Sequence, residues 1–293
     1  MSCEETADPI RERTLTNTSS LTPTISIAEQ AAHLIAWFRE SAECYVVALS
    51  GGVDSAVVAK AASLADVQVD LATGESPSLA RQELRDATDM AARIELPHRT
   101  IETCETNNQQ YQRNDARRCY HCKTHLFEAF KRQFPGATIV TGTNADDLHD
   151  YRPGLEAAAE HQVRAPLAEL GFGKSVVRGL AQFWSLPIAE KPASPCLASR
   201  IAYGVEVTRE RLEMIEQAEQ WLREHGLIEF RVRLHAGELA RIEIAVESLA
   251  RFASDPLRGQ LLAHFKSLGF RFVTLDIAGF ASGSLNQLIQ IDR

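Results

Sequence analysis

The feature that most constrains the fold is the segment ALSGGVDSA at residues 48–56, where a short apolar run gives way to glycines and serines. A buried strand that ends at two glycines and continues as a helix leaves unpaired backbone N–H groups in a concave turn, beside the positive end of the helix dipole. Gly51 and Gly52 let the backbone approach an anion without interference from side chains. Ser50 and Ser55 add hydroxyl donors. The segment therefore predicts an anion-binding turn between a strand and a helix.

Strand-like and helical stretches alternate around this turn. Strand-like runs occupy residues 45–49, 67–73, 98–102 and 138–142, and helical patterns occupy residues 25–41, 55–64, 79–94 and 121–133. Strands separated by helices indicate an α/β fold with a parallel sheet and helices on both faces. Ligands of such folds bind at the carboxyl ends of the strands.

The pattern changes after about Gly204. A long helix is expected at residues 208–225 with Thr208 as its N-cap, and the alternating segment FRVRLHAGELARIEIAV after it could form a hairpin. One further helix and a final strand, RFVTLD, follow. The sequence thus predicts three parts, which are a tail at residues 1–23, an α/β domain at residues 24–204 and a smaller α+β domain at residues 205–293.

Composition excludes several classes of partner. The formal net charge is -8, from 31 basic and 39 acidic residues, so no global field attracts nucleic acid. No apolar stretch has the length of a membrane span, and the N-terminus lacks the apolar middle of a secretory signal. We therefore expect a soluble, cytoplasmic protein that binds neither membranes nor nucleic acid, and whose six cysteines do not form a disulfide framework.

Three of the cysteines form a second constellation. Cys119 and Cys122 make a C-x-x-C pair in RCYHCK, and Cys196 stands downstream in SPCLASR. Three thiolates could hold three irons of a [4Fe–4S] cluster and leave the fourth iron open to an exogenous sulfide. A zinc site completed by His121 or another histidine, or three unrelated buried cysteines, fits the spacing as well. The other three cysteines are interpreted as packing residues.

Arginines supply candidate sites for anionic groups. Arg231 and Arg233 lie on the same face of a predicted strand because alternate residues point the same way. Two adjacent guanidinium groups suit phosphate or carboxylate groups, although solvated strand charges are the alternative. Arg200, near Cys196, could assist such binding or form a surface salt bridge.

The first segment, SGGVDS, resembles the pyrophosphate-binding PP-loop of the ATP pyrophosphatase superfamily. The ATPase P-loop is excluded because no lysine follows the second glycine in its frame. The resemblance implies that ATP is split to AMP and pyrophosphate and that Asp54 helps to hold Mg²⁺. The implied ATP-binding residues are Ser50, Gly51, Gly52, Val53, Asp54 and Ser55. Ala56 departs from the superfamily, which commonly has serine or threonine at that position.

Two further groups could meet the nucleotide. Asp146 and Asp147 follow the expected strand at residues 138–142, where one of them could bind ATP or Mg²⁺. Both could equally cap the next turn. Ser78, after the second strand, could contact adenosine or act as the N-cap of the next helix.

An ordered set of motifs narrows the resemblance to one family. From about Ala48 to Asn286 the chain resembles the LarE family of ATP-dependent sulfur transferases in the motifs SGGVDSA, ESPSLARQEL, RCYHCKTHLF, GTNADDLHDYRPGLEAA, SPCLASRI, RVRLHAGELARIE and FRFVTLDIAGFASGSLN. The resemblance implies a role in making the nickel-pincer nucleotide cofactor of lactate racemase. The implied substrate is a small nucleotide, pyridinium-3,5-biscarboxylic acid mononucleotide, whose carboxylate is adenylylated by ATP before a sulfur nucleophile displaces AMP.

The sulfur source divides the LarE family. Members with a C-x-x-C in addition to the third cysteine resemble cluster enzymes, which implies Cys119, Cys122 and Cys196 as ligands of a [4Fe–4S] cluster. Members of the other type give up the sulfur of one cysteine, at the position of Cys196, and keep a dehydroalanine in its place. The resemblance also implies a substrate-phosphate site at Arg231 and Arg233, and a homo-oligomer.

Two alternatives from other classes stay open. A tRNA thiolase also combines a PP-loop with three cysteines, but the net charge of -8 and the absence of basic clusters argue against a tRNA-binding surface. A nucleotide-binding module with structural zinc would not be an enzyme. Pyrophosphate release that depends on the pyridinium substrate separates the LarE function from both.

Overall fold

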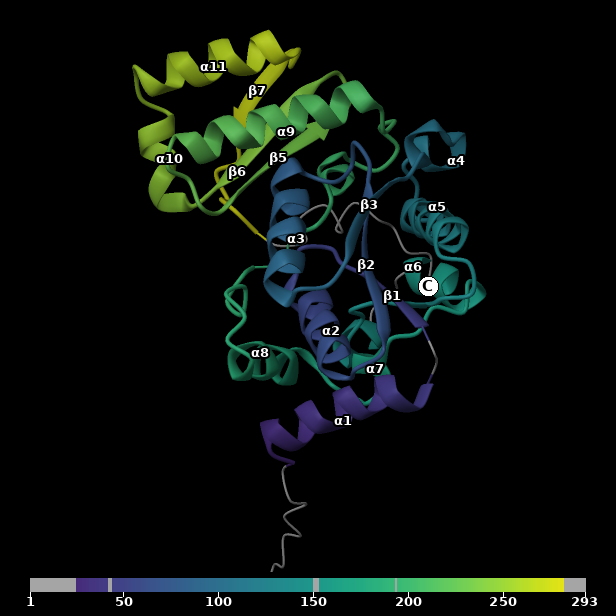
Figure 1. The fold of residues 1–293 in the computed structure, drawn as a ribbon. Coiled ribbons are helices and arrows are strands. Elements are labelled where there is room, and N and C mark those ends of the chain that lie inside the picture. The colour runs from purple at the N-terminus through teal and green to yellow at the C-terminus, as the bar shows by residue number, and fades with distance from the viewer. Residues whose placement is uncertain (1–24, 42–43, 150–152, 193, 282–293) are drawn as a thin grey trace, which may run out of the picture.

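The chain folds into two units, each built on its own sheet (Figure 1). The computed structural model describes residues 25–41, 44–149, 153–192 and 194–281. The tail expected at residues 1–23 lies outside these ranges.

The first unit is built on a four-stranded parallel sheet in the order β3-β2-β1-β4. Its strands are β1 (Cys44–Ala48), β2 (Gln68–Glu75), β3 (His98–Glu102) and β4 (Thr138–Val140). Val46 of the central strand β1 is in register with Asp70 on one side and with Ile139 on the other. The predicted parallel sheet is confirmed. Strand β2 runs two residues beyond its expected end because Glu75 still pairs with Glu102.

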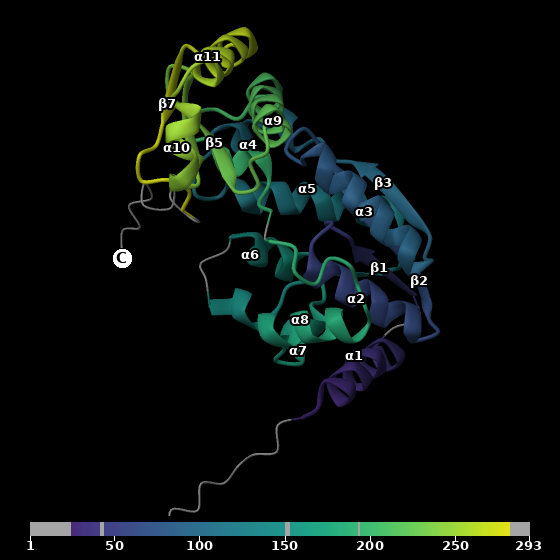
Figure 2. The ribbon, with the colours of Figure 1, turned by 90° about the vertical axis from the view of Figure 1, so that its left-hand side faces the viewer.

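Helices cover both faces of this sheet, as predicted. One face carries α1 (Ile27–Ser41), α2 (Val53–Leu64), α3 (Arg81–Ile94) and α8 (Lys174–Phe183), and the other carries α5 (Arg118–Gln133) and α6 (Pro153–Glu160) (Figure 1 and Figure 2). Side chains alternate along β1, so Tyr45 and Val47 pack with the first group and Val46 with the second. Because β1 is buried on both faces, it is a continuous apolar run in the sequence.

The second unit packs a three-stranded sheet against helices. It contains α9 (Arg209–Glu224), β5 (Phe230–His235), β6 (Leu239–Ile244), α10 (Val246–Phe252), α11 (Leu257–Leu268) and β7 (Phe272–Leu275). The predicted hairpin is confirmed as the antiparallel pair β5 and β6, and β7 adds to β6 in parallel. The predicted cap is also confirmed, since Thr208 Oγ1 accepts from the backbone N–H of Arg211 at 3.3 Å.

One helix was expected between the hairpin and the last strand, but two are present. Helix α10 ends at Phe252, and α11 starts after Pro256. Proline lacks a backbone N–H and its ring clashes with the preceding turn, so a helix through this point would lose hydrogen bonds.

Short helical segments connect the main elements. They are η1 (Glu105–Asn107), α4 (Gln109–Gln112), η2 (Ala145–His149), α7 (Pro166–Glu169) and η3 (Leu197–Arg200). The segment η3 packs with the second unit, because Leu197 and Ile201 lie in its core and Ala202 N donates to Leu234 O at 2.9 Å. Cys196 therefore stands where the two units meet. No helix within the described ranges is long and apolar enough to cross a membrane.

Glu169 of α7 links three parts of the first unit. Its carboxylate accepts from Trp37 Nε1 of α1 at 2.9 Å, from the guanidinium of Arg164 at 2.5 and 2.8 Å, and from the backbone of Ala165 at 3.1 Å. These bonds, led by that of Arg164, hold the pKa of the Glu169 carboxyl at about 2, against an ordinary value of 4.5. A lowered folded-state pKa stabilises the fold above the unfolded value, and this contribution is lost as the pH falls toward the folded value.

Replacing Glu169 by glutamine should therefore lower the free energy of unfolding by about 1–2 kcal/mol at neutral pH. The difference from the unaltered protein should narrow as the pH falls below 4.5, because the carboxylate is then protonated in the unfolded chain. Urea unfolding at neutral pH and near pH 3.5 measures both effects, with Glu40→Gln on the exposed end of α1 as the control. A difference that does not change with pH would contradict the ionic role of Glu169.

Candidate functional site

The turn between β1 and α2 has the predicted form. Gly51 has a positive φ of 77°, which favours glycine, and Gly52 is the N-cap of α2 with an extended backbone. The helix starts at Val53 rather than at the expected Ser55. Ser55 is buried and stabilises the turn, since its hydroxyl accepts from Ser50 N at 3.2 Å and donates to Gly52 O at 3.0 Å. The hydroxyl predicted for ligand binding at Ser55 thus serves the shape of the turn.

Gly142, after β4, lies directly against this turn. A Cβ added to Gly142 would stand 2.5 Å from Ser55 N and 2.7 Å from the carbonyl carbon of Asp54. Distances under 3.0 Å are not tolerated, and the colliding atoms are backbone, which cannot rotate away. A side chain at this position would displace the start of α2.

Asp54, predicted as a magnesium ligand, points to a lysine. Its carboxylate lies 2.6 Å from Lys174 Nζ and accepts from Asn144 Nδ2 at 3.2 Å. Asn144 is buried, whereas Lys174 remains partly exposed at the start of α8. Lys174 therefore brings a positive charge beside the anion-binding turn. Sequence reasoning missed both partners, because they come from distant segments and lack a motif of their own.

The two aspartates after β4 have different partners. Asp146 Oδ2 accepts from the backbone N–H of Lys174 at 2.7 Å, and Asp147 Oδ2 accepts from Asn144 N at 3.1 Å. Asp147 therefore caps the next turn, as the capping alternative has it, whereas Asp146 binds the backbone at the start of the distant helix α8. Direct contact of either aspartate with ATP stays a prediction. The capping alternative for Ser78 is wrong: α3 starts after Ala80, and the Ser78 hydroxyl donates instead to Glu105 Oε1 at 2.9 Å.

The three cysteines of the second constellation lie on two segments that are held together. Cys119 and Cys122 stand at the start of α5, and Cys196 immediately precedes η3. Arg118 of α5 donates to Ala198 O at 2.9 Å, and Leu197 N donates to Ser78 O at 2.8 Å. These bonds fix the cysteine-bearing loop against α5 and the end of β2.

The surroundings of Cys122 shift the pKa of its thiol. Burial raises the pKa of its thiol, and the charge of Glu105 raises it further. Cys196 and Cys119 add smaller contributions in the same direction. The charge of Lys123 opposes these contributions, so burial next to Glu105 accounts for the raised pKa of Cys122. Cys122 is half-buried, whereas Cys119 and Cys196 are exposed.

The described residues contain no preassembled metal site, whether for zinc or for a cluster. Within the described residues, no group of three or more histidine, cysteine, aspartate or glutamate side chains is placed to hold one metal ion, so His121 does not complete a zinc site there. A [4Fe–4S] cluster has a different requirement, because each of its cysteine ligands binds a different iron. Three cysteine sulfurs on two tethered segments are the ligand type that such a cluster takes.

Two buried polar atoms beside the cysteines were missed from the sequence. Glu105 Oε2 and the Tyr111 hydroxyl have no hydrogen-bond partner within the described residues. Burial raises the pKa of Tyr111, and the charges of Cys196 and Cys122 raise it further. Neither residue stands in a recognisable motif, because both lie in the polar segment ETNNQQYQRN.

The predicted arginines gather around the loop of Cys196. Arg200 pairs with Glu219 at 3.0 Å and Arg233 with Glu243 at 3.0 Å. Both pairs are buried, so the alternatives of a surface salt bridge for Arg200 and of solvation for Arg233 are wrong. Arg233 Nη1 also donates to Ser199 O at 3.2 Å. Arg233 therefore points inward from β5.

Arg231 differs from these two. It is half-buried, its guanidinium lies 5.1 Å from the ring centroid of Phe280, and it forms no ion pair with the described residues. Burial lowers its pKa, and the nearby charge of Arg200 lowers it further. A cation in this position gains from an anionic ligand.

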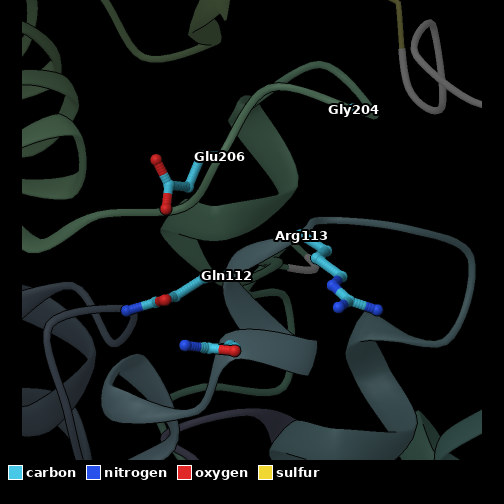
Figure 3. Close-up of a pocket in the computed structure, with 5 residues that line it drawn as sticks. Gln112, Arg113, Gly204 and Glu206 are labelled. Carbon is cyan, nitrogen blue, oxygen red and sulfur yellow. The ribbon is translucent and has the colours of Figure 1, made fainter.

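A surface hollow of about 420 Å³ lies apart from these groups (Figure 3). It is lined by Gln109, Gln112, Arg113, Gly204 and Glu206, between α4 and the start of the second unit. None of the predicted site residues lines it. The candidate site is therefore defined by the turn after β1, the cysteines and the arginines.

Comparison with known proteins adds relatives that span most of the chain. No protein-family model matches. The chain is 43% identical over 251 residues to an uncharacterized protein of Synechocystis, covering 83% of this chain and 92% of the relative. It is 31% identical over 271 residues to the pyridinium-3,5-bisthiocarboxylic acid mononucleotide synthase of Lactiplantibacillus plantarum, covering 90% of this chain and 96% of that protein. A protein of Methanocaldococcus jannaschii is 29% identical over 241 residues, covering 81% and 90%.

Replacing Gly142 by alanine should deform the turn after β1. We expect the affinity for ATP to fall at least about tenfold, because the added carbon collides with the backbone at the start of α2. Calorimetric titration with ATP measures the change. Gly259→Ala in α11 is the matched control, since its added carbon meets only an ordinary contact at 3.4 Å. Equal affinity in the Gly142 variant and the control would show that the turn does not bind ATP.

Proposed function

Because the chain belongs to the LarE family, we propose that it is an ATP-dependent sulfur transferase acting on pyridinium-3,5-biscarboxylic acid mononucleotide, in the biosynthesis of the nickel-pincer nucleotide cofactor. The observation that carries this proposal is the identity to the Lactiplantibacillus plantarum synthase along 96% of that enzyme. The turn after β1, the cysteines and the inward-facing arginines supply the groups that the reaction needs.

Activation of the carboxylate is the first step. The free N–H groups of the turn bind the phosphates of ATP, and Lys174 compensates their charge. Asp54 is a carboxylate suited to Mg²⁺, the ion that accompanies ATP. A carboxylate oxygen of the substrate attacks the α-phosphorus, the bond to pyrophosphate breaks, and an acyl adenylate results. The carbonyl carbon thereby gains AMP as a leaving group.

The arginines around η3 divide between substrate binding and support of the loop. Arg231 is the best candidate for its phosphate, since no carboxylate of the described residues forms an ion pair with it. Arg200 and Arg233 keep their acidic partners and fix the loop, because Arg200 donates to the carbonyl of Cys196 at 3.0 Å and Arg233 to that of Ser199. The reacting carboxylate is thus kept near Cys196.

Sulfur transfer is the second step. A sulfur nucleophile adds to the carbonyl carbon of the adenylate and expels AMP, which leaves a thiocarboxylate. We propose that Cys119, Cys122 and Cys196 hold a [4Fe–4S] cluster, which when bound supplies the transferred sulfur. In the alternative route, Cys196 itself attacks, and cleavage of its carbon–sulfur bond with loss of the α-proton leaves dehydroalanine.

Replacing Cys196 by alanine should separate the two steps. Pyrophosphate release that depends on the pyridinium dicarboxylate should continue, because the turn and Lys174 are intact, while thiocarboxylate should no longer form. A coupled pyrophosphate assay and mass spectrometry of the product measure the two steps. Thiocarboxylate formed at the normal rate would show that Cys196 neither binds nor donates the sulfur.

Replacing Cys119 by alanine distinguishes the sulfur sources. If a cluster is the source, protein reconstituted without oxygen should contain near-stoichiometric iron and acid-labile sulfide, and the variant should lose most of both. Cys104→Ala, outside the constellation, is the control, since Cys104 is exposed and the interpretation of this cysteine as a packing residue is wrong. Protein without iron whose Cys196 loses one sulfur in mass after turnover would contradict the cluster and support the alternative.

A further inference from the structure

We propose that Lys191 is a positioning residue that holds the ATP-binding turn in its working geometry and shields the bound phosphates from two carboxylates of α3. This inference rests on the proposed binding of ATP by the turn after β1. Lys191 stands in the segment that leads from α8 to Cys196, far from the turn in sequence. No motif of the sequence marks it.

The ammonium group of Lys191 has three acceptors. It donates to Gly51 O at 2.8 Å, to Glu83 Oε2 at 2.9 Å and to Asp86 Oδ2 at 2.5 Å. An ammonium has three N–H donors, so these contacts satisfy it fully. The side chain is only 18% exposed. Because little water screens them, its charged hydrogen bonds are stronger than they would be in water.

The bond to Gly51 O fixes the turn itself. The peptide group between Gly51 and Gly52 is planar and trans, so its carbonyl oxygen and its N–H point in opposite directions. By holding the carbonyl, Lys191 also sets the direction of the Gly52 N–H, at the N-cap of α2. Glycine at 51 alone leaves this peptide free to rotate, because its positive φ is only one of several accessible states.

The carboxylates of Glu83 and Asp86 explain why the turn needs the positive charge of Lys191. Glu83 and Asp86 lie on α3, whose backbone is packed closely on the turn: a Cβ added to Gly51 would stand 2.8 Å from Glu83 O. Burial opposes ionisation of Asp86, but hydrogen bonds from Lys191 and Gln82 keep its pKa below the ordinary value. Two negative charges beside a phosphate site repel the ligand, and Lys191 offsets them.

Replacing Lys191 by methionine, whose unbranched side chain is one atom shorter and carries no charge, should raise the Kd and the KM for ATP about tenfold or more. The maximal rate of pyrophosphate release should change much less. The matched control is Lys131→Met on the exposed last turn of α5, which should leave both constants unchanged.

Removing the Asp86 carboxylate tests whether Lys191 acts through its charge or only supports the fold. In the double variant Lys191→Met with Asp86→Asn, the affinity for ATP should recover at least about threefold over the single variant, because one repelling charge is gone. A Kd for ATP unchanged in Lys191→Met would overturn the inference. So would a loss of affinity that Asp86→Asn does not relieve.

The outcomes distinguish this inference from the proposed function. Unaltered protein that binds no ATP would overturn both. Unaltered protein that binds ATP and forms thiocarboxylate, together with a Lys191→Met variant of equal affinity, would overturn the inference alone.

Discussion

The site depends on one constraint: the backbone N–H groups at the start of α2 must stay unpaired and the turn before them must keep its shape. The backbone N–H groups at the N-terminus of α2 can serve a ligand only if the turn after β1 is fixed by other contacts. Ser55 braces the turn from inside, Gly142 permits β4 to lie against it, and Lys191 holds the Gly51 carbonyl. The parallel sheet supplies the frame, because β1 and β4 are neighbours.

Features that depend on neighbouring residues could be predicted from the sequence. The alternation of apolar runs and helical stretches gave the parallel sheet, the two glycines gave the turn, and Thr208 was recognisable as an N-cap because capping depends on neighbouring residues only. The ordered motifs identified the family, and the identity to the Lactiplantibacillus plantarum synthase confirms it.

Contacts between distant segments could not be predicted in this way. Lys174 and Lys191 look like surface lysines in the sequence, and only the folded chain brings them to Asp54 and Gly51. The buried partners Glu219 and Glu243 of the arginines were missed for the same reason. Capping was one of two roles open to Ser78, because a serine before a helix suits capping, but a tertiary contact directs its hydroxyl to Glu105.

In the proposed reaction, one chain performs both nucleotide activation and sulfur transfer, and a carboxylate oxygen of the substrate becomes bonded to AMP before sulfur replaces it. The most direct test uses the pyridinium dicarboxylate mononucleotide labelled with oxygen-18 in its carboxylates, together with ATP and the complete protein. AMP should carry one labelled oxygen, and the organic product should carry sulfur in place of oxygen. Unlabelled AMP, or ADP as the nucleotide product, would contradict the proposed reaction.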